Sequence, residues 1–172
     1  TKRFDRENGH KIHMQTLCGM AHYDFRLRRG YSYEQAFTVM RRLRLPYSQA
    51  QEMFRRMVFN VVARNQDDHT KNISFLMDES GAWRLSPAYD MGYAYNPSGF
   101  WTTTHQMSIN GKFDGVTRKD LLECAASNNI KNAAEIIDQV SEAASRWTGI
   151  AKECGVPRNM IDNIKSNLLL NI

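Results

Sequence analysis

The stretch Asn65-Gln66-Asp67-Asp68-His69-Thr70-Lys71-Asn72 gathers two carboxylates, three amides, a histidine and a lysine in eight consecutive residues. Asp67 stands five residues before Asn72, which is the interval between the catalytic base and the metal-binding asparagine in the catalytic loop of protein kinases. Phosphoryl transfer needs a carboxylate near the attacking hydroxyl and oxygen ligands for Mg²⁺. The stretch therefore predicts a catalytic loop, and the elements around it set the fold.

Two amphipathic helices are predicted before this loop. Ser32 with Gln35 is a candidate capping box, and apolar residues follow at helical spacing until Pro46 ends the pattern. Ser48 with Gln51 repeats the capping pattern and opens a second segment with a broader apolar face. The second helix should be well buried, and the loop would follow its C-terminal end.

A β-hairpin is predicted directly after the loop. Two apolar runs, 73–77 and 82–85, flank the polar tetrapeptide Asp78-Glu79-Ser80-Gly81, as in a hairpin with a four-residue turn. Such a hairpin would carry the chain from Asn72 back to Asp90.

The rest of the chain is consistent with one domain over residues 1–172. Its predicted segments are a hinge and irregular segment at 1–30, helices at 31–64, the catalytic loop and hairpin at 65–90, a long loop at 91–116, and helices at 117–172. The last helices are predicted at 117–129, with Thr117 and Asp120 as caps, at about 132–153, and at 157–170 after Pro157.

Length and composition indicate a folded, soluble protein. The 172 residues are 42% hydrophobic and 24% charged, which is enough apolar material for a real core. No run of 18 apolar residues occurs and the first residues are charged, so we expect a cytoplasmic protein that does not enter a membrane. The three cysteines form no C-x-x-C pair, which predicts buried free thiols instead of disulfides or zinc ligands. A net charge of +5 favours an anionic partner.

Spacing selects Asp67 over Asp68 as the general base, because only Asp67 stands five residues before Asn72. Asp68 should point elsewhere. Asn72 and Asp90 offer an amide oxygen and a carboxylate, which are hard ligands suited to Mg²⁺. Lys71 could neutralise charge on the transferred phosphoryl group, and His69 could brace the loop or contact phosphate.

A polar turn between a helix and a hairpin is the alternative interpretation, because Asn, Asp and His often cap turns. The loop alone is balanced between the two interpretations. Asp90 favours the catalytic one, since it follows a predicted hairpin and is preceded by Pro87 and Tyr89, as the metal-binding carboxylate of a kinase would be.

Other polar and aromatic residues are expected to be structural. Histidines 10, 13 and 105 lack zinc-type spacing to cysteines or carboxylates, so we expect surface or locally bonded side chains. The arginine runs should form a solvated face, although they could contact nucleic acid; they are Arg26, Arg28, Arg29, Arg41, Arg42 and Arg44. The aromatic residues of the long loop should pack within it, although they could stack on a base or substrate; they are Tyr93, Tyr95, Phe100 and Trp101.

Four motifs in this order resemble the C-terminal lobe of HipA-type toxin kinases, and the resemblance spans nearly the whole chain. The motifs are Arg3-Phe4-Asp5-Arg6, Asn65-x-Asp67-x-His69-x-Lys71-Asn72, Pro87-x-Tyr89-Asp90 and Ile109-Asn110-Gly111-Lys112. The family is similar in architecture to protein kinases. The resemblance therefore implies a mainly α (α+β) fold: the helical C-lobe of a protein-kinase-like fold, with a small β-hairpin that carries the metal site.

The resemblance also implies an activity, cofactors and partners. It implies an ATP-dependent serine/threonine protein kinase of a toxin-antitoxin module, which arrests growth by phosphorylating an aminoacyl-tRNA synthetase and is neutralised by a DNA-binding HipB-like antitoxin. Contact with DNA would be indirect, through that antitoxin. The implied roles are proton acceptor for Asp67, Mg²⁺ ligands for Asn72 and Asp90, nucleotide-site lining for His69, Lys71 and Tyr89, and an adenine-binding hinge for the backbone around Lys2 and Phe4.

Two departures limit these implications. Gln66, Asp68 and Thr70 stand where smaller residues are common in the family, so substrate preference could differ. The chain also opens without methionine in what looks like the end of a strand, and it contains neither a glycine-rich phosphate loop nor a strand lysine. We therefore expect the C-terminal part of a longer protein, inactive by itself.

Two rival functions remain open from the sequence. A non-catalytic lobe that binds an antitoxin would have no need of three oxygen ligands at kinase spacing. A nucleic-acid binder that uses the arginine runs would lose affinity steeply with salt.

Overall fold

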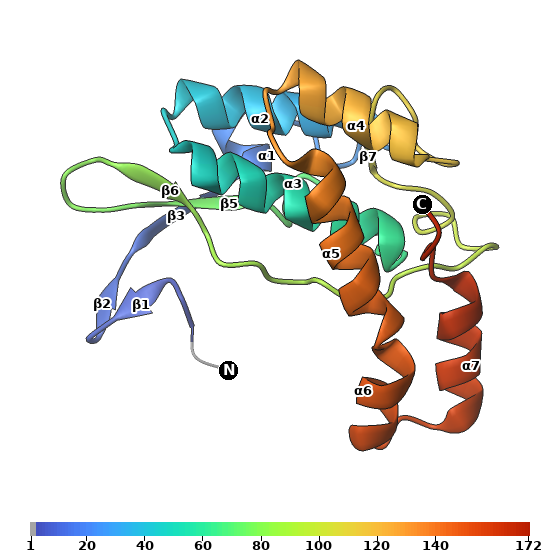
Figure 1. Ribbon diagram of the computed structural model, residues 1–172. Helices are drawn as coiled ribbons and strands as arrows, with labels where there is room; N and C mark the ends of the chain where they lie inside the picture. The colour runs from blue at the N-terminus through green and yellow to red at the C-terminus, as the bar shows by residue number, and fades with distance from the viewer. Residues whose placement is uncertain (1–2) are drawn as a thin grey trace.

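The computed structural model describes residues 3–172, which form a mixed α/β fold (Figure 1). Seven helices and three small sheets occur in this part of the chain. The helices are α1 Leu17–Met20, α2 Tyr33–Arg42, α3 Tyr47–Val62, α4 Arg118–Ser127, α5 Ala133–Ser145, α6 Trp147–Glu153 and α7 Arg158–Asn167. The strands are β1 Arg6–Glu7, β2 His10–Lys11, β3 His13–Thr16, β4 Tyr31–Ser32, β5 Ser74–Met77, β6 Trp83–Leu85 and β7 Met107–Ser108.

Helix α3 forms the centre of the core. Its apolar residues recur every three or four positions, and Phe54, Met57, Val58 and Val61 are fully buried. Helices α2 and α5 pack against it. Because the last turn of α3 is buried by this packing, the loop that leaves it starts from a fixed position.

The helix starts are partly as predicted. Ser32 and Gln35 form the capping box of α2, since each side chain accepts from the other's backbone N–H. The predicted cap at Ser48 is wrong, because the N-cap of α3 is Pro46, two residues earlier, and Tyr47 is its first residue. Proline has a fixed φ compatible with helix entry and no N–H to satisfy, so this helix starts without a side-chain cap.

The predicted hairpin is confirmed as β5 and β6. Asp78 holds its turn by accepting from the backbone N–H groups of Ser80 and Ala82. Strand β3 pairs antiparallel with β5 and completes a three-stranded sheet in the order β3-β5-β6. The segment 1–30 is thus more regular than expected where it is described, with three strands before α1.

The long loop 91–116 contains one regular pairing that was not predicted. Strand β7 lies parallel to β4, with Tyr31 opposite Met107. The motif that ends at Lys112 is a tight turn, in which Asn110 and Gly111 both have positive φ values, 50° and 77°. Lys112 Nζ donates to Asp120 at 2.9 Å, and this anchors the turn on the first turn of α4.

The aromatic residues of this loop are not all buried in it. Phe100 and Trp101 are among the most exposed large apolar residues of residues 3–172, so the prediction that they form loop core is wrong for both. Tyr93 and Tyr95 are half-buried.

The predicted helix at 132–153 is divided. The backbone N–H of Arg146 bonds to Ala143, three residues back, and this tight turn separates α5 from α6. Helix α6 then packs against α7, and Trp147 Nε1 donates to the carbonyl of Ile161 at 3.2 Å. The pair projects from the rest of the molecule (Figure 1).

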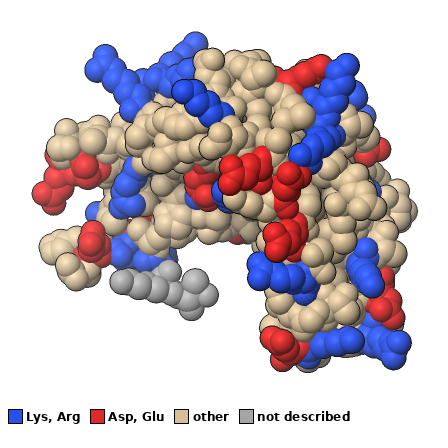
Figure 2. Space-filling model, in the orientation of Figure 1, with Lys and Arg blue, Asp and Glu red and all other residues tan. Residues whose placement is uncertain are grey.

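Charges of both signs are spread over the surface. Figure 2 shows Lys and Arg gathered on the side where α2 lies, and mixed charges over α5, α6 and α7. Arg41, Arg42 and Arg44 are exposed at the end of α2, which agrees with a solvated face. Within residues 3–172, no helix combines the length and the apolar character needed to cross a bilayer.

Two of the three cysteines are buried as expected. Cys18 and Cys124 are buried free thiols, whereas Cys154 is exposed. The prediction of buried thiols is therefore wrong for Cys154.

Candidate functional site

The candidate catalytic loop is held at its start by the end of α3. Arg64 adopts a positive φ of 56°, which ends the helix. The backbone N–H of Asn65 then returns to the carbonyl of Asn60 at 2.9 Å, and Gln66 pairs with Ala94. Because Ala94 follows Asp90 by four residues, this pairing brings the segment after Asp90 beside the loop.

The other end of the loop is held by the segment after β3. The backbone N–H groups of Leu17 and Cys18 donate to the carbonyls of Ile73 and Thr70, at 2.7 and 3.1 Å. The loop is thus fixed on both sides by backbone hydrogen bonds, a geometry suited to holding side chains in place.

Inside the loop, Asn72 folds back onto the backbone of Asp67. Its Nδ2 donates to the Asp67 carbonyl at 2.9 Å, and the N–H of His69 donates to the same carbonyl at 3.0 Å. The five-residue interval is therefore the span of one closed turn. Asn72 Oδ1 makes no hydrogen bond to another atom of residues 3–172, so this oxygen is available to a ligand.

The Asp67 carboxylate is half-buried and lies within electrostatic reach of Asp90. Burial raises the pKa of Asp67 above its ordinary value; His69 lowers this pKa, and the Asp90 carboxylate raises it further. The hydrogen bonds from Asn65 Nδ2 to the Asp90 carbonyl and from the Gln66 N–H to the Ala94 carbonyl place the Asp90 segment beside the loop that carries Asp67. A raised pKa also makes Asp67 a better proton acceptor than an exposed aspartate.

Asp90 is placed by its backbone. It has a positive φ of 54°, and its carbonyl accepts from Asn65 Nδ2 at 3.4 Å. Its side chain is exposed and forms neither a hydrogen bond nor an ion pair with residues 3–172. The carboxylate thus faces solvent on the side of the catalytic loop.

Tyr89 connects the loop, the sheet and the N-terminal segment. Its hydroxyl donates to the Lys71 carbonyl at 2.5 Å and contacts Ser74 Oγ on β5. The ring of Phe4 lies against it, with centroids 5.7 Å apart. Burial raises the pKa of Tyr89, so this hydroxyl stays neutral and keeps its role as a donor. Lys2, the other predicted hinge residue, lies outside the described residues.

Lys71 and His69 differ in exposure. Lys71 is exposed, and its Nζ lies 4.0 Å from the centroid of the Phe25 ring. His69 is half-buried, and its Nδ1 is a buried atom without a hydrogen-bond partner in the described chain. Such a nitrogen can form a hydrogen bond to a group in the site, as donor or acceptor, without breaking an existing hydrogen bond.

Asp68 has a structural role that its position in the sequence did not reveal. It is buried, and its carboxylate accepts from Tyr33 Oη at 2.8 Å, from His105 Nδ1 at 2.8 Å and from the Gln106 N–H at 2.7 Å. The prediction that the Asp68 side chain points elsewhere than that of Asp67 therefore agrees with the geometry. His105 is a buried histidine whose partner, Asp68, lies 37 residues away, so the expectation of a surface or locally bonded side chain is wrong for it.

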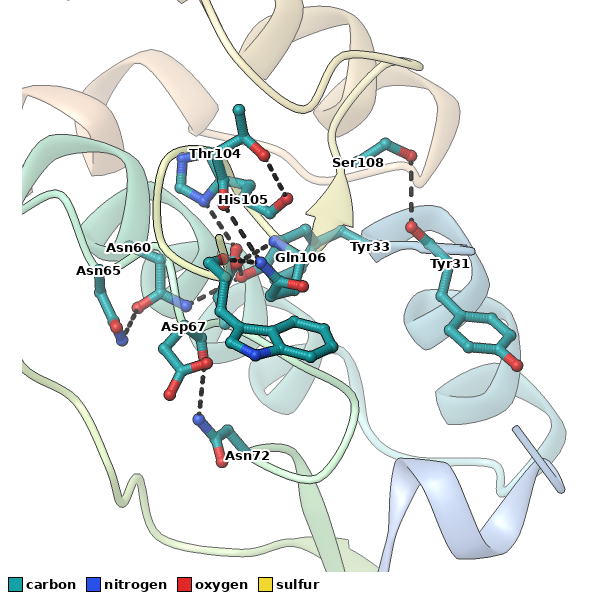
Figure 3. A network of polar contacts seen from close by, with 12 residues as sticks. Tyr31, Tyr33, Asn60, Asn65, Asp67, Asn72, Thr104, His105, Gln106 and Ser108 are labelled. Atoms are coloured by element: carbon teal, nitrogen blue, oxygen red, sulfur yellow. Dashed lines mark hydrogen bonds and ion pairs between the residues drawn. The ribbon is translucent and has the colours of Figure 1, made fainter. Parts of the chain in front are cut away.

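The Asp68 cluster continues as a chain of buried polar contacts (Figure 3). Tyr33 Oη accepts from Asn60 Nδ2 at 2.9 Å, and Asn60 Oδ1 accepts from Asn65 Nδ2 at 2.9 Å. Since Asn65 also donates to the carbonyl of Asp90, the chain links Asp90 to Asp68 through α2 and α3. Sequence reasoning missed Tyr33, Asn60 and His105, because their partners lie 5 to 37 residues away and no local pattern signals them.

Within residues 3–172, no group of three or more histidine, cysteine or carboxylate side chains is placed to hold a metal ion. Only the chemistry of two oxygen donors fits magnesium. Asn72 Oδ1 and the Asp90 carboxylate are hard oxygen donors, and neither is used by another residue of this range. The cavity beneath the loop has a volume of about 20 Å³, far below the several hundred Å³ of an enclosed small-molecule site. This cavity is therefore too small to enclose a small molecule.

Comparison with known proteins identifies the family. The family model described as the HipA-like C-terminal domain matches residues 1–147. The chain belongs to this family. It is also 35% identical, over 65 residues, to the serine/threonine-protein kinase toxin HipA of Shewanella oneidensis, a match that covers 38% of this chain and 15% of that protein.

A solved HipA structure has the same fold. This is the HipA chain of the complex of HipA, HipB and operator DNA from Shewanella oneidensis MR-1, with a TM-score of 0.74 and 21% sequence identity. The similarity covers 98% of this chain and 46% of the HipA chain. The present chain therefore spans about half the length of the solved relative, and it corresponds to a HipA C-terminal domain.

Proposed function

We propose that this HipA C-terminal domain is the helical, kinase-like lobe of an ATP-dependent serine/threonine protein kinase. The observation that carries the proposal is that hydrogen bonds join the segments that carry Asp67, Asn72 and Asp90. Asn72 Nδ2 donates to the Asp67 carbonyl at 2.9 Å, and the Asp90 carbonyl accepts from Nδ2 of Asn65, two residues before Asp67, at 3.4 Å. A polar turn without a catalytic role would not need an unpaired carboxylate from a segment 18 residues further along the chain.

In this proposal Asp67 is the general base. It would accept the proton of a serine or threonine hydroxyl as that oxygen bonds to the terminal phosphorus of ATP and the bond to ADP breaks. The half-buried position of Asp67 and the two N–H groups that hold its carbonyl would fix the direction of the carboxylate.

Asn72 and Asp90 would hold Mg²⁺, which when bound neutralises charge on the phosphate oxygens. His69 Nδ1 and the exposed Lys71 ammonium would contact phosphate. Tyr89 would line the nucleotide site, with the backbone near Phe4 and Lys2 as the adenine hinge; the contact of Phe4 with Tyr89 supports this for Phe4.

The partners follow from the family. Its similarity to a chain solved with HipB and operator DNA supports a HipB-like antitoxin as partner, with DNA contacted through it. We propose a cytoplasmic toxin-antitoxin module that arrests growth, as in bacterial persistence, by phosphorylating a protein substrate. An aminoacyl-tRNA synthetase is the substrate class that family membership favours.

The test is phosphate incorporation from labelled ATP by the full-length protein. Asp67→Ala should reduce incorporation about 10²–10⁴-fold while the fold and ATP binding persist. Asp162→Ala removes an exposed carboxylate on α7 and is the matched control. Undiminished incorporation by Asp67→Ala would refute the assignment, and absence of Mg²⁺-dependent ATP binding by the unaltered protein would favour a non-catalytic interaction lobe.

A further inference from the structure

Exposed rings and unpaired cations border the catalytic loop on one side. We call Phe25, Arg28, Arg29, Phe100 and Trp101 the aromatic rim. Phe25, Phe100 and Trp101 are 53%, 67% and 49% exposed, which is unusual for side chains of this size. Contiguous exposed apolar residues of this kind mark interaction sites more often than isolated ones do.

Contacts join the two halves of the rim to each other. The guanidinium of Arg28 lies 4.7 Å from the Phe100 ring centroid, and its Nη2 donates to Thr103 Oγ1 at 3.1 Å. Arg29 donates from Nη2 to Thr104 Oγ1 at 3.1 Å. The segment before β4 and the loop before β7 therefore form one surface.

The same surface adjoins the catalytic loop at two points. Lys71 Nζ lies over the Phe25 ring at 4.0 Å. With its amide nitrogen turned toward the long loop, Gln66 donates to the carbonyls of Thr102 and Thr103, both at 3.0 Å. Since Asp67 follows Gln66 directly, the rim starts beside the proposed base.

The rim carries positive charge that its neighbours leave unpaired. Arg28, Arg29 and Lys71 form no ion pair within residues 3–172, whereas the adjacent Arg26 is paired with Asp24 at 3.0 Å. Arginine beside aromatic rings is the composition enriched at the centres of protein interfaces.

We propose that the aromatic rim is the docking surface for the protein substrate, and that it selects a segment in which acidic side chains flank an apolar one near the phosphorylated hydroxyl. The carboxylates would pair with Arg28 and Arg29, and the apolar side chain would pack on Trp101 and Phe100. The inference rests on the proposed function, because it is the position of Asp67 that makes a hydroxyl-bearing segment the occupant.

A nucleic acid is the less favoured occupant. Binding to nucleic acid draws most of its affinity from many cation–phosphate contacts, and the rim contributes two arginines with three large rings between them.

The direct test is peptide binding to the full-length protein without ATP. The probe is a fluorescein-labelled peptide with one serine, one phenylalanine and several glutamates, followed by fluorescence anisotropy. Arg28→Gln should weaken binding about fivefold and Trp101→Ala about tenfold. Arg146→Gln alters an exposed cation at the α5–α6 junction, and Ile150→Ala alters an exposed apolar residue on α6; both variants should leave affinity unchanged.

Two further measurements separate the outcomes. A peptide with lysines in place of the glutamates should bind more weakly, and equal binding of both peptides would overturn the charge argument. If a single-stranded oligonucleotide competes with the peptide, and Arg28→Gln weakens oligonucleotide binding most, the surface would be assigned to nucleic acid instead. Replacement of Arg28 could disturb the loop, but Trp101 is exposed, so its replacement should leave the loop folded. Unchanged peptide affinity in Trp101→Ala would overturn the docking proposal.

Failure of this proposal is distinguishable from failure of the proposed function. Peptide affinity is measured without phosphoryl transfer, so it can be lost in rim variants whether or not Asp67→Ala is inactive. Active Asp67→Ala with rim-dependent binding would leave a docking surface without the proposed base. If Asp67→Ala is inactive but peptide binding does not depend on the rim, the proposed kinase function stands and the docking proposal fails.

Discussion

Replacement of Tyr33 with phenylalanine removes one hydroxyl from the centre of the polar chain beneath the catalytic loop. That hydroxyl donates to Asp68 Oδ2 at 2.8 Å and accepts from Asn60 Nδ2 at 2.9 Å. The ring is 1% exposed and stays in the core. The change is therefore confined to two hydrogen bonds, both of them buried.

The cost can be estimated from what each partner loses. Asn60 keeps a buried N–H without its acceptor, which costs about 1–3 kcal/mol. Asp68 loses one of three donors but keeps His105 and Gln106, so its share is nearer to about 1 kcal/mol. The two terms share one network and do not simply add. We expect a total of about 2–3 kcal/mol, which corresponds to about a 30- to 150-fold change in the local opening equilibrium.

Amide hydrogen exchange in the full-length protein measures this directly. The Gln106 N–H donates to Asp68 Oδ1 at 2.7 Å, so segment 104–108 should exchange about 30- to 150-fold faster in Tyr33→Phe. Tyr95→Phe is the matched control, because Arg64 covers its ring at 3.8 Å and its hydroxyl has no hydrogen-bond partner within residues 3–172. Exchange within twofold of the unaltered protein would refute the idea that this network holds the loop.

Three other outcomes follow from burial and charge. Burial and a neighbouring carboxylate raise the pKa of Asp67, so the contribution of Asp67 to the free energy of unfolding favours the folded state at low pH and is lost as pH rises through the raised pKa. Asp67→Asn should abolish that part of the pH dependence of thermal unfolding. Superimposable pH profiles of the two proteins would contradict this. Burial raises the pKa of Asp120, but hydrogen bonds from a lysine and a threonine hold this pKa below its ordinary value. Asp120→Ala should therefore lower the free energy of unfolding in urea by about 2 kcal/mol at neutral pH. The difference between the two proteins should shrink as pH falls below the ordinary carboxyl range, and a constant difference would exclude the charge effect. Native labelling with a thiol reagent should modify the exposed Cys154 well before the buried Cys18 and Cys124, and equal rates at all three would show that the core opens readily.

Much of the helical framework could be predicted from local patterns. The capping box of α2 and that of α4, where Thr117 pairs with Asp120, are interactions between residues three apart, so their signature is present in the sequence itself. The hairpin β5–β6 was equally visible, because its turn is made by consecutive residues. The errors occurred where tertiary contacts decided the local structure. Helix α3 starts after Pro46 without a side-chain cap, and α5 ends at Ser145, where a tight turn at Arg146 leads into α6, which packs on α7.

The candidate site shows the same division. Spacing alone distinguished Asp67 from Asp68, and the structure supports the distinction by burying Asp68 in a hydrogen-bonded cluster. The cluster itself could not be predicted, because it joins α2, α3 and the loop at His105. The exposure of Phe100 and Trp101 could likewise not be predicted, because the sequence pattern around an aromatic loop residue is the same whether its ring packs inward or faces solvent.

The sequence by itself determined the order of the elements, the choice of Asp67 and the family, because capping pairs, apolar periodicity and the five-residue interval are properties of neighbouring residues. The tertiary structure alone decided which groups meet. The approach of Asp90 to Asp67, the chain from Asn65 to Asp68 and the aromatic rim all join segments that are distant in sequence. Such contacts depend on how the buried faces of the helices and sheet pack together, and no local pattern encodes that geometry.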